Sequence, residues 1–478
     1  MPSPASMAVL VVSTRTVSPP PPRHGRIPLT TWDVSFLSAN YIQKGLLYLP
    51  PSMSSTAAVV DHLAAALSET LAAYYPVAGR FVTDKDPCGG CSVSIDCGGQ
   101  GVELIHAVAD GVSIADVIPP DADVPRLVQS FFPLDGAVNH DGHELPLLAV
   151  QVTELAADGA IFLGFAYNHA LSDGTAFWAF LNAWAQTARS NLNLDGPPPP
   201  SSPLLDRWSP DGGPARPIVL PCADVSAEFI ERLPPPLLRE RMLHFSAESL
   251  RALKERAGQE LLAAGDTAGA AALTRFQALS SLLWRSITRA RNLPATQPTV
   301  CRVAINNRGR LEPPLPPAYF GNSIYAIGTE PWVSAELLEE GSHGRAAAAV
   351  GRAVAAHTDG VIRAKVAAWM EKPVVYNLRF FDRAGTMMGS SPRFDMYGCD
   401  FGWGRPLAAR SGKGNKSDGK TSLYPSGRDE GGMDAELTLT PENMAALELD
   451  EEFWAAVSPD EKPPVLTTKQ QQQKDGKD

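Results

Sequence analysis

The spacing of apolar residues predicts strands and helices along the first half of the chain. Residues 57–75 carry apolar side chains at intervals of three and four, which is typical of an amphipathic helix. Residues 145–155 and 160–167 are predicted to be two strands, joined by a turn at 157–159. The aromatic stripe along residues 175–190 then predicts a second helix.

The same alternation continues in the second half. Residues 242–259 predict a strand followed by a helix, with Ser246 as the helix N-cap. Residues 274–291 again have helical spacing, and a further strand is predicted to start at 298. Because strands and helices alternate in both halves, the sequence predicts an α/β or α+β protein.

A change of composition suggests where the chain divides. Residues 191–224 are rich in Pro, Gly and Ser and have no sustained period, so we interpret them as a crossover. They would join an N-terminal domain of residues 1–190 to a C-terminal domain of residues 225–466. Residues 467–478 are polar and of low complexity, which predicts a disordered tail.

Composition and charge exclude several classes of protein. With 44% hydrophobic and 19% charged residues, the chain has the composition of a soluble globular protein. The net charge is −11 and no basic stripe is interleaved with aromatic residues, so we expect no nucleic-acid partner. The apolar runs fall far short of the ~20 residues of a membrane span, and no secretory signal is recognisable. We therefore expect a cytosolic protein.

The cysteines leave two interpretations. Six in so long a chain are too few for a disulfide scaffold, but Cys88, Cys91 and Cys97 lie close together, and a Cys-x-x-Cys pattern can bind a metal or be redox-active. No second such pair follows to complete a four-ligand site. We favour a β-hairpin, in which 91–96 and 102–107 are strands joined by a glycine-rich turn.

The strongest candidate for chemistry follows the predicted strand 160–167. There the sequence Asn-His-Ala-Leu-Ser-Asp-Gly contains His169, Asp173 and Gly174, before the helix begins. A histidine at a strand end is held rigidly, and imidazole titrates near neutral pH, so His169 is suited to accept a proton. The alternative is an ordinary loop histidine whose hydrogen bonds are satisfied.

Two further motifs lie in the second half. Residues 414–421 fit the phosphate loop of nucleotide hydrolases, but Pro425 and nearby glycines prevent the helix that this motif requires. We interpret its lysines as a solvated basic loop that is a candidate neighbour of an anionic ligand. Residues 400–406, Asp-Phe-Gly-Trp-Gly-Arg-Pro, combine glycines suited to tight backbone geometry with Trp403, an indole donor.

Together, the motifs at 168–174 and 400–406 resemble the paired signatures of the plant BAHD acyltransferases. Three other stretches, 74–81, 276–285 and 306–322, are similar to sequences typical of that family, and the likeness runs from about residue 8 to 456. The chain departs from many members in carrying two asparagines at 306–307, where an Asp or Cys is common.

The resemblance implies a fold and a reaction. It implies two α/β domains of the chloramphenicol-acetyltransferase type, with mixed sheets and helices and a tunnel between them. The reaction would move an acyl group from coenzyme A to a hydroxyl or amine of a small specialised or cuticle-type acceptor. Acyl-CoA would be a co-substrate, no cofactor or metal would be bound permanently, and the protein would be a monomer.

The resemblance also implies roles for individual residues. His169 would be the general base, and Trp403 would donate to the oxyanion of the tetrahedral intermediate. The remaining positions, which are expected to be structural or to contact coenzyme A, are Asp173 and Gly174 (loop structure, the aspartate paired with an arginine), Asp400 and Gly402 (second motif), Arg275 (expected partner of Asp400), and Thr274 and Lys420 (coenzyme A).

Two other functions remain open on the same scaffold. One is a lyase-like or otherwise specialised enzyme, because Trp32, Asp33 and the stretch 415–420 are similar to a branch of the family with atypical members. The other is a non-catalytic binding protein, which the presence of both His169 and Trp403 disfavours.

Overall fold

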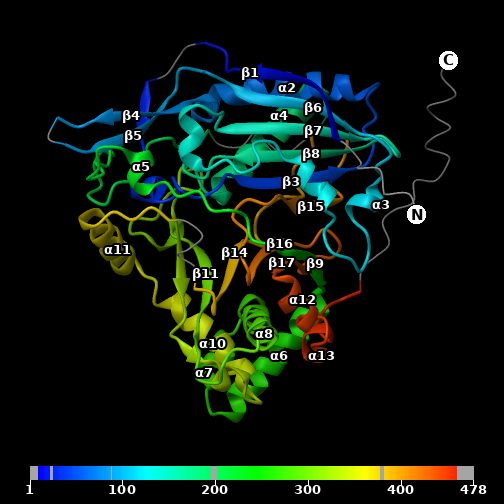
Figure 1. Cartoon of the computed structure of the whole chain (residues 1–478), viewed down its shortest axis with the longest axis vertical. Helices are drawn as coiled ribbons and strands as arrows, with labels where there is room; N and C mark the ends of the chain where they lie inside the picture. The colour runs from blue at the N-terminus through cyan, green and yellow to red at the C-terminus, as the bar shows by residue number, and fades with distance from the viewer. Residues whose placement is uncertain (1–8, 22–24, 88, 195–201, 377–381, 460–478) are drawn as a thin grey trace.

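The computed structural model describes residues 9–21, 25–87, 89–194, 202–376 and 382–459. Two mixed β-sheets form its centre, and helices cover their outer faces (Figure 1). The first sheet has six strands, with β6 and β7 parallel and all other neighbours antiparallel. Their order is β1 (Val9–Val17), β6 (Val102–Ala109), β7 (Leu148–Leu155), β8 (Ala160–Tyr167), β3 (Ile42–Tyr48) and β15 (Ala408–Ser411).

Two long helices cover the first sheet, at the top of Figure 1. They are α2 (Thr56–Ala73) and α4 (Gly174–Asn191), both close to the predicted ranges. The Trp184 indole is fully buried between them and donates to the Leu63 carbonyl at 3.1 Å. The apolar stripes therefore lie on the sheet side, as the spacing of three and four requires.

The second sheet also has six strands in the described residues, with its helices below it in Figure 1. Ser246 caps the first of these helices and accepts a hydrogen bond from the Ser249 amide at 3.1 Å, as predicted. The strand order is β12 (Ile324–Gly328), β11 (Cys301–Asn306), β14 (Thr386–Ser390), β16 (Lys420–Pro425), β17 (Met433–Leu439) and β9 (Arg239–Phe245); the helices are α6 (Ala247–Ala263), α8 (Arg275–Ala290) and α10 (Ser342–Ala355).

Smaller elements complete the fold. The remaining strands form a three-stranded sheet and a two-stranded sheet: β2 (Arg26–Pro28), β5 (Cys91–Asp96) and β4 (Arg80–Lys85); β10 (Pro298–Thr299) and β13 (Trp332–Val333). The short α-helices are α1 (Thr31–Val34), α3 (Ile114–Val117), α5 (Val225–Phe229), α7 (Thr267–Ala272), α9 (Ser334–Leu338), α11 (Asp359–Glu371), α12 (Pro441–Leu447) and α13 (Glu451–Trp454). The stretch after Lys420 is strand β16, so the helix of a phosphate loop is not formed there.

The predicted hairpin around Cys97 is wrong in its pairing. Both strands exist, but β5 pairs with β2 and β4, whereas β6 pairs with β1 and β7 in the first sheet. Gly99 and Gly101, with φ of 75° and 100°, turn the chain from one sheet to the other. Cys91 and Cys97 are buried thiols, while Cys88 lies outside the described residues.

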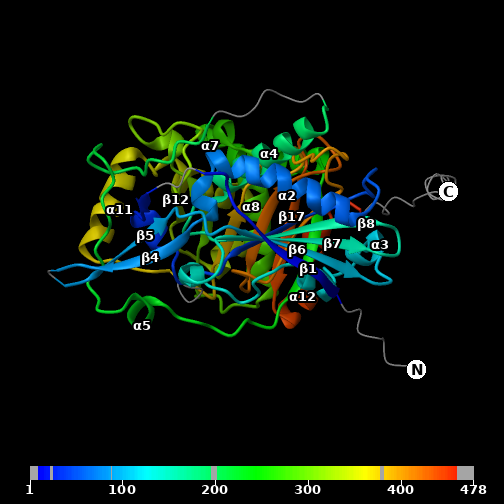
Figure 2. The same cartoon turned by 90° about the horizontal axis from the view of Figure 1, so that it is seen from above.

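The C-terminal half contributes to the first sheet. Strand β15 pairs antiparallel with β3, and Met396, Tyr397 and Phe401 are buried in the same core as the N-terminal helices. From above, the chain from α5 to β9 runs along one side of the molecule (Figure 2). The boundaries at 190 and 225 stay a prediction, and the expected tail at 467–478 lies outside the described residues.

No helix among the described residues is long and apolar enough to cross a bilayer.

Buried histidines make the stability of the fold depend on pH. Burial lowers the pKa of His343 to about 4 and that of His357 to about 4, with nearby cations acting in the same direction. In the unfolded chain these imidazoles take up a proton near pH 6.5, so proton uptake favours unfolding as the pH falls from 6.5 towards 4. By pH 4 we expect this to cost up to roughly 3 kcal/mol for each histidine.

Chemical denaturation between pH 7 and 4.5 checks this expectation against a matched variant. His343→Gln removes one of the two groups, so its free energy of unfolding should fall less steeply with decreasing pH than that of the wild type. Equal slopes for the two proteins would contradict the assignment.

Candidate active site

A cavity of about 1700 Å³ lies between the two sheets. Its lining combines Ile42 and Lys44 of β3, Ile305 of β11, and Lys420 of β16 with His169. The predicted base therefore faces a space that both halves of the chain enclose. The volume is large enough for two substrates of ordinary size.

The backbone of His169 is fixed from both sides. Its amide donates to Asn139 Oδ1 at 2.8 Å, and its carbonyl accepts from Asn322 Nδ2 at 2.8 Å. The Phe36 ring is stacked on the imidazole, with centroids 4.2 Å apart and an angle of 10° between planes. These contacts leave the ring little freedom to turn, so it is presented to the cavity in one orientation.

The electrostatic setting of His169 favours the neutral imidazole. Burial lowers the pKa of His169, and the positive charge of Lys420 acts in the same direction. The Nδ1 atom is buried and has no hydrogen-bond partner among the described residues. At neutral pH the side chain is thus unprotonated, which is the state that a general base requires.

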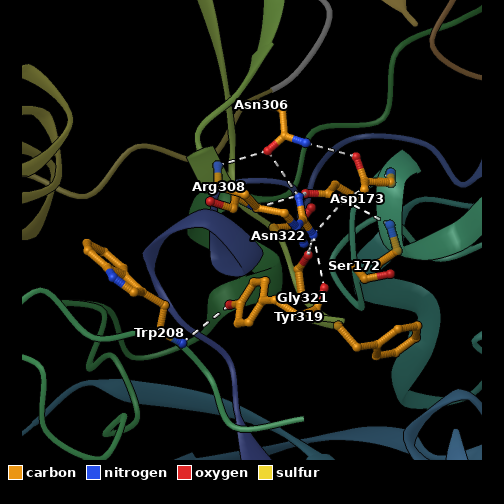
Figure 3. A network of polar contacts seen from close by, with 12 residues as sticks. Ser172, Asp173, Trp208, Asn306, Arg308, Tyr319, Gly321 and Asn322 are labelled. Atoms are coloured by element: carbon orange, nitrogen blue, oxygen red, sulfur yellow. Dashed lines mark hydrogen bonds and ion pairs between the residues drawn. The ribbon is translucent and has the colours of Figure 1, made fainter. Parts of the chain in front are cut away.

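Asp173 belongs to the polar network of Figure 3, where it has a structural role. Among the described residues, no hydrogen bond joins its carboxylate to the imidazole of His169. Its carboxylate caps α4 by accepting from the Thr175 and Ala176 amides, at 3.1 and 3.2 Å. The same carboxylate forms a bidentate ion pair with Arg308, at 2.6 and 3.0 Å, and accepts from the Ser323 amide at 2.9 Å. The expected arginine partner is therefore Arg308, from the other half of the chain.

A second buried carboxylate supports His169 indirectly. Asp33 is fully buried, and its Oδ1 accepts from Asn322 Nδ2 at 2.9 Å, so one amide group connects Asp33 to the His169 carbonyl. Asn306 donates to Thr175 Oγ1 at 3.1 Å beside this network. Asn139 and Asn322 were not predicted from the sequence. Asn322 ends the stretch 306–322 that is similar to the family, but its hydrogen bond to the His169 carbonyl joins segments distant in sequence.

Gly174 permits a close approach to the cavity wall. A Cβ on this residue would lie 2.9 Å from the Phe394 ring, so a larger side chain would displace the ring. Gly174 also lines the cavity.

The position of Trp403 contradicts its predicted role as the oxyanion donor. Its ring packs edge-on against Tyr48 and His62, with centroids 6.1 Å apart in each case, and it is absent from the described cavity lining. Tyr48 pairs with Ile161, eight residues before His169, which places these rings about 25 Å along the strands from the imidazole. An indole there cannot donate to an oxyanion at His169.

The predicted partner of Asp400 is also wrong. Asp400 forms its ion pair with Arg189, in the last turn of α4, and accepts from the Gly402 and Gly404 amides at 2.8 and 2.9 Å. Arg275 instead donates to the Gly431 carbonyl at 3.3 Å. Gly402 has φ of 112°, which a glycine adopts without strain, so the motif forms a tight turn against α4.

The predicted coenzyme A residues lie on the cavity but at different places. Thr274 is the N-cap of α8 and accepts from the Gln277 amide at 3.3 Å. Lys420 lies at the start of β16, and its Nζ donates to the Asn415 carbonyl at 2.5 Å. Further cationic residues in the lining are Lys254, Arg275, Arg393 and Arg428.

Comparison with known proteins identifies the family. The model of the Transferase family matches residues 7–454. An uncharacterized acetyltransferase of Arabidopsis thaliana is 33% identical over 90% of this chain and 94% of its own length. The BAHD acyltransferase DCR of Arabidopsis thaliana is 31% identical over 94% of this chain and 92% of its own length. Shikimate O-hydroxycinnamoyltransferase of Nicotiana tabacum is 27% identical over 80% of this chain and 85% of its own length.

Solved structures agree with the fold. Vinorine synthase has a TM-score of 0.71 at 20% identity, over 95% of this chain and 99% of its own. TRI101 of F. graminearum, complexed with coenzyme A and T-2 mycotoxin, has a TM-score of 0.70 at 17% identity, over 91% of this chain and 99% of its own. The chain belongs to the BAHD family of acyl-CoA-dependent acyltransferases. The predicted family, α/β fold class and enzyme class are confirmed.

The ion pair of Asp400 is tested by a double-mutant cycle. Asp400→Ala should lower the free energy of unfolding by roughly 1–3 kcal/mol, because the side chains are only partly buried and two backbone amides also lose their acceptor. Combined with Arg189→Ala the effects should be less than additive, whereas with Arg275→Ala they should simply add. If the effect of Asp400→Ala were instead less than additive with that of Arg275→Ala, the predicted ion pair between Asp400 and Arg275 would be supported after all.

Replacement of Trp403 separates packing from catalysis. Trp403→Phe should leave kcat unchanged for the folded enzyme, because the indole is remote from His169, while a smaller ring lowers the melting temperature modestly. Acyl-transfer assays and thermal melts on the one variant suffice. A kcat reduced a hundredfold in a well-folded variant would show that the indole donates to the reaction after all.

Proposed function

We propose that this chain transfers an acyl group from coenzyme A to a hydroxyl or amine of a small-molecule acceptor, with His169 as the general base. The single observation that supports this most is the position of His169, whose ring is fixed against Phe36 and faces the cavity between the sheets. Burial lowers its pKa, so the neutral form predominates at the pH of the cytosol.

The imidazole handles one proton in each direction. It accepts the proton of the acceptor hydroxyl or amine as that atom forms a bond to the thioester carbonyl carbon. When the tetrahedral intermediate collapses, the carbon–sulfur bond breaks and the imidazolium returns the proton to the departing thiolate. Because the proton is returned, the enzyme is regenerated without any further reactant.

Several charged groups near the start of α8 support a coenzyme A site on that side of the cavity. Arg275 begins the helix and contacts the Gly431 carbonyl, and Arg428 belongs to the same loop as Gly431. A helix N-terminus and arginine side chains are both suited to phosphate groups. Thr274 stays a candidate contact there, and the expectation of a cytosolic monomer stays a prediction.

Replacement of the histidine tests the proposed base. His169→Ala should lower kcat by at least about 100-fold, the smallest usual contribution of a general base, with little change in melting temperature. Thiol release from a panel of acyl-CoA thioesters, with pooled alcohols and amines, measures the rate. His143→Ala is the matched control, because His143 contacts Thr83 outside the described cavity lining and should leave the rate unchanged.

The pH profile gives an independent check. Because burial lowers the pKa of His169 from its ordinary value of 6.5, kcat/KM measured from pH 8 to 5 should fall on acidification with a midpoint below that value. Wild-type activity equal to that of His169→Ala would overturn the proposal and favour an atypical or non-catalytic function.

A further inference from the structure

Three lysines meet in the cavity at the junction of the two sheets. Lys44 comes from β3 of the first sheet, Lys420 begins β16 of the second, and Lys416 lies in the loop before it. None of them has a role in the proton transfers assigned to His169. Their charges therefore need a separate explanation.

Lys416 is neutralised within the protein. Its Nζ donates to Glu240 Oε2 at 2.5 Å and to Glu436 Oε1 at 2.7 Å, and all three side chains are buried. The other oxygen of Glu436 accepts hydrogen bonds from the hydroxyls of Ser411 and Tyr424. Both carboxylates are thus engaged with Lys416 and neutral groups.

Among the described residues, the ammonium groups of Lys44 and Lys420 donate only to neutral acceptors. Lys44 Nζ donates to the Tyr424 hydroxyl at 2.6 Å, and Lys420 Nζ donates to the Asn415 carbonyl at 2.5 Å. In the described part of the chain, neither ammonium lies within 4.0 Å of a carboxylate oxygen. Three lysines facing two carboxylates leave one positive charge without a counter-ion.

Burial without a carboxylate in contact lowers the pKa of both lysines. Burial lowers the pKa of Lys44 to about 7, and the charges of Lys416 and Lys420 add to the effect while Glu436 opposes it. Burial likewise lowers the pKa of Lys420 to about 8, with Lys416 acting in the same direction and Glu436 against it. A bound anion would relieve this cost, because it restores the charge balance.

The loop that carries Lys416 and Lys420 is held in place beforehand. Asn415 accepts from the Asn40 amide at 2.9 Å and donates to the Asn40 carbonyl at 2.8 Å, and the Gly414 amide donates to Gln43 Oε1 at 2.9 Å. The lysines therefore need little reorganisation to bind a ligand, which lowers the entropic cost of binding.

The lysines are also close enough to His169 to act on the reacting molecule. Lys44 pairs with Phe165, four residues before His169, so the two backbones are about 13 Å apart along the strands. The long lysine side chain shortens this gap on the cavity side, and the charge of Lys420 already lowers the pKa of His169. A small molecule can span from the lysines to the imidazole.

We propose that Lys44 and Lys420 bind a carboxylate of a substrate while that substrate reacts at His169. The inference rests on the proposed function and names the substrate class, an anionic molecule in place of a neutral one. The acceptor is the favoured source, and a carboxylate on the acyl group is the second. The phosphates of coenzyme A fit less well, because the pantetheine arm separates them from the thioester that must lie at His169.

A binding experiment on the purified full-length protein tests this without relying on turnover. The probes are shikimate and three aromatic hydroxycarboxylates, each compared with its methyl ester by isothermal titration calorimetry. Malonyl-CoA compared with acetyl-CoA tests the second source in the same way. We expect at least one carboxylate to bind about 10- to 100-fold more tightly than its neutral counterpart.

Variants assign that preference to the two lysines. Lys44→Met and Lys420→Met should each remove most of the preference and leave the binding of the esters unchanged, and Lys420→Arg should restore part of it. Lys413→Met is the matched control, because this lysine of the same loop is exposed, pairs with Asp135 and is not in the described cavity lining. It should bind all probes as the wild type does.

The outcomes separate this inference from the proposed function. Equal binding by the wild type of every carboxylate and its ester, and also of malonyl-CoA and acetyl-CoA, overturns the inference, as does a preference that survives in both methionine variants. A preference seen only with malonyl-CoA moves the carboxylate to the acyl group. If the carboxylates bind as expected but His169→Ala transfers acyl groups as fast as the wild type, the proposed base fails, and the carboxylate site at the two lysines stands without it.

Discussion

The buried ion pair between Asp173 and Arg308 is the contact on which the site depends. Asp173 begins α4 above the first sheet, and Arg308 follows β11 of the second, so the pair joins the two halves beside the cavity. Charges this deeply buried are costly unless they are hydrogen-bonded, and the Thr175, Ala176 and Ser323 amides also donate to the carboxylate. The pair thus ties the start of α4 to the segment that follows β11.

The position of His169 depends on the ion pair between Asp173 and Arg308. Because Arg308 holds the stretch up to Asn322 in place, through the Tyr319 and Gly321 carbonyls, the amide of Asn322 can reach the His169 carbonyl. His169 is then oriented by its backbone and by Phe36, and no carboxylate of the described residues is hydrogen-bonded to its ring. The mechanism needs only a neutral imidazole in a fixed place, and burial supplies the neutrality.

Features set by residues close together in the sequence were predicted correctly, and contacts between distant segments were not. Helices α2, α4 and α8 were predicted well because an apolar stripe and a cap are properties of neighbouring residues. The pairing of β5 and the partner of Asp400 were wrong because both depend on segments distant in sequence. Trp403 was misplaced for a related reason: a motif typical of a family does not reveal at which end of the strands it lies.

The second motif nevertheless affects the cavity through the chain that follows it. Asp400 anchors the turn to Arg189, and the next strand, β15, pairs with β3 so that Ser411 lies opposite Lys44. Immediately after Ser411 comes the loop with Lys416 and Lys420, which Asn415 and Gly414 fasten to the start of β3. A turn about 25 Å from His169 is thus continuous with the strand that leads into the lysine loop, and we infer that its contribution to function is positional.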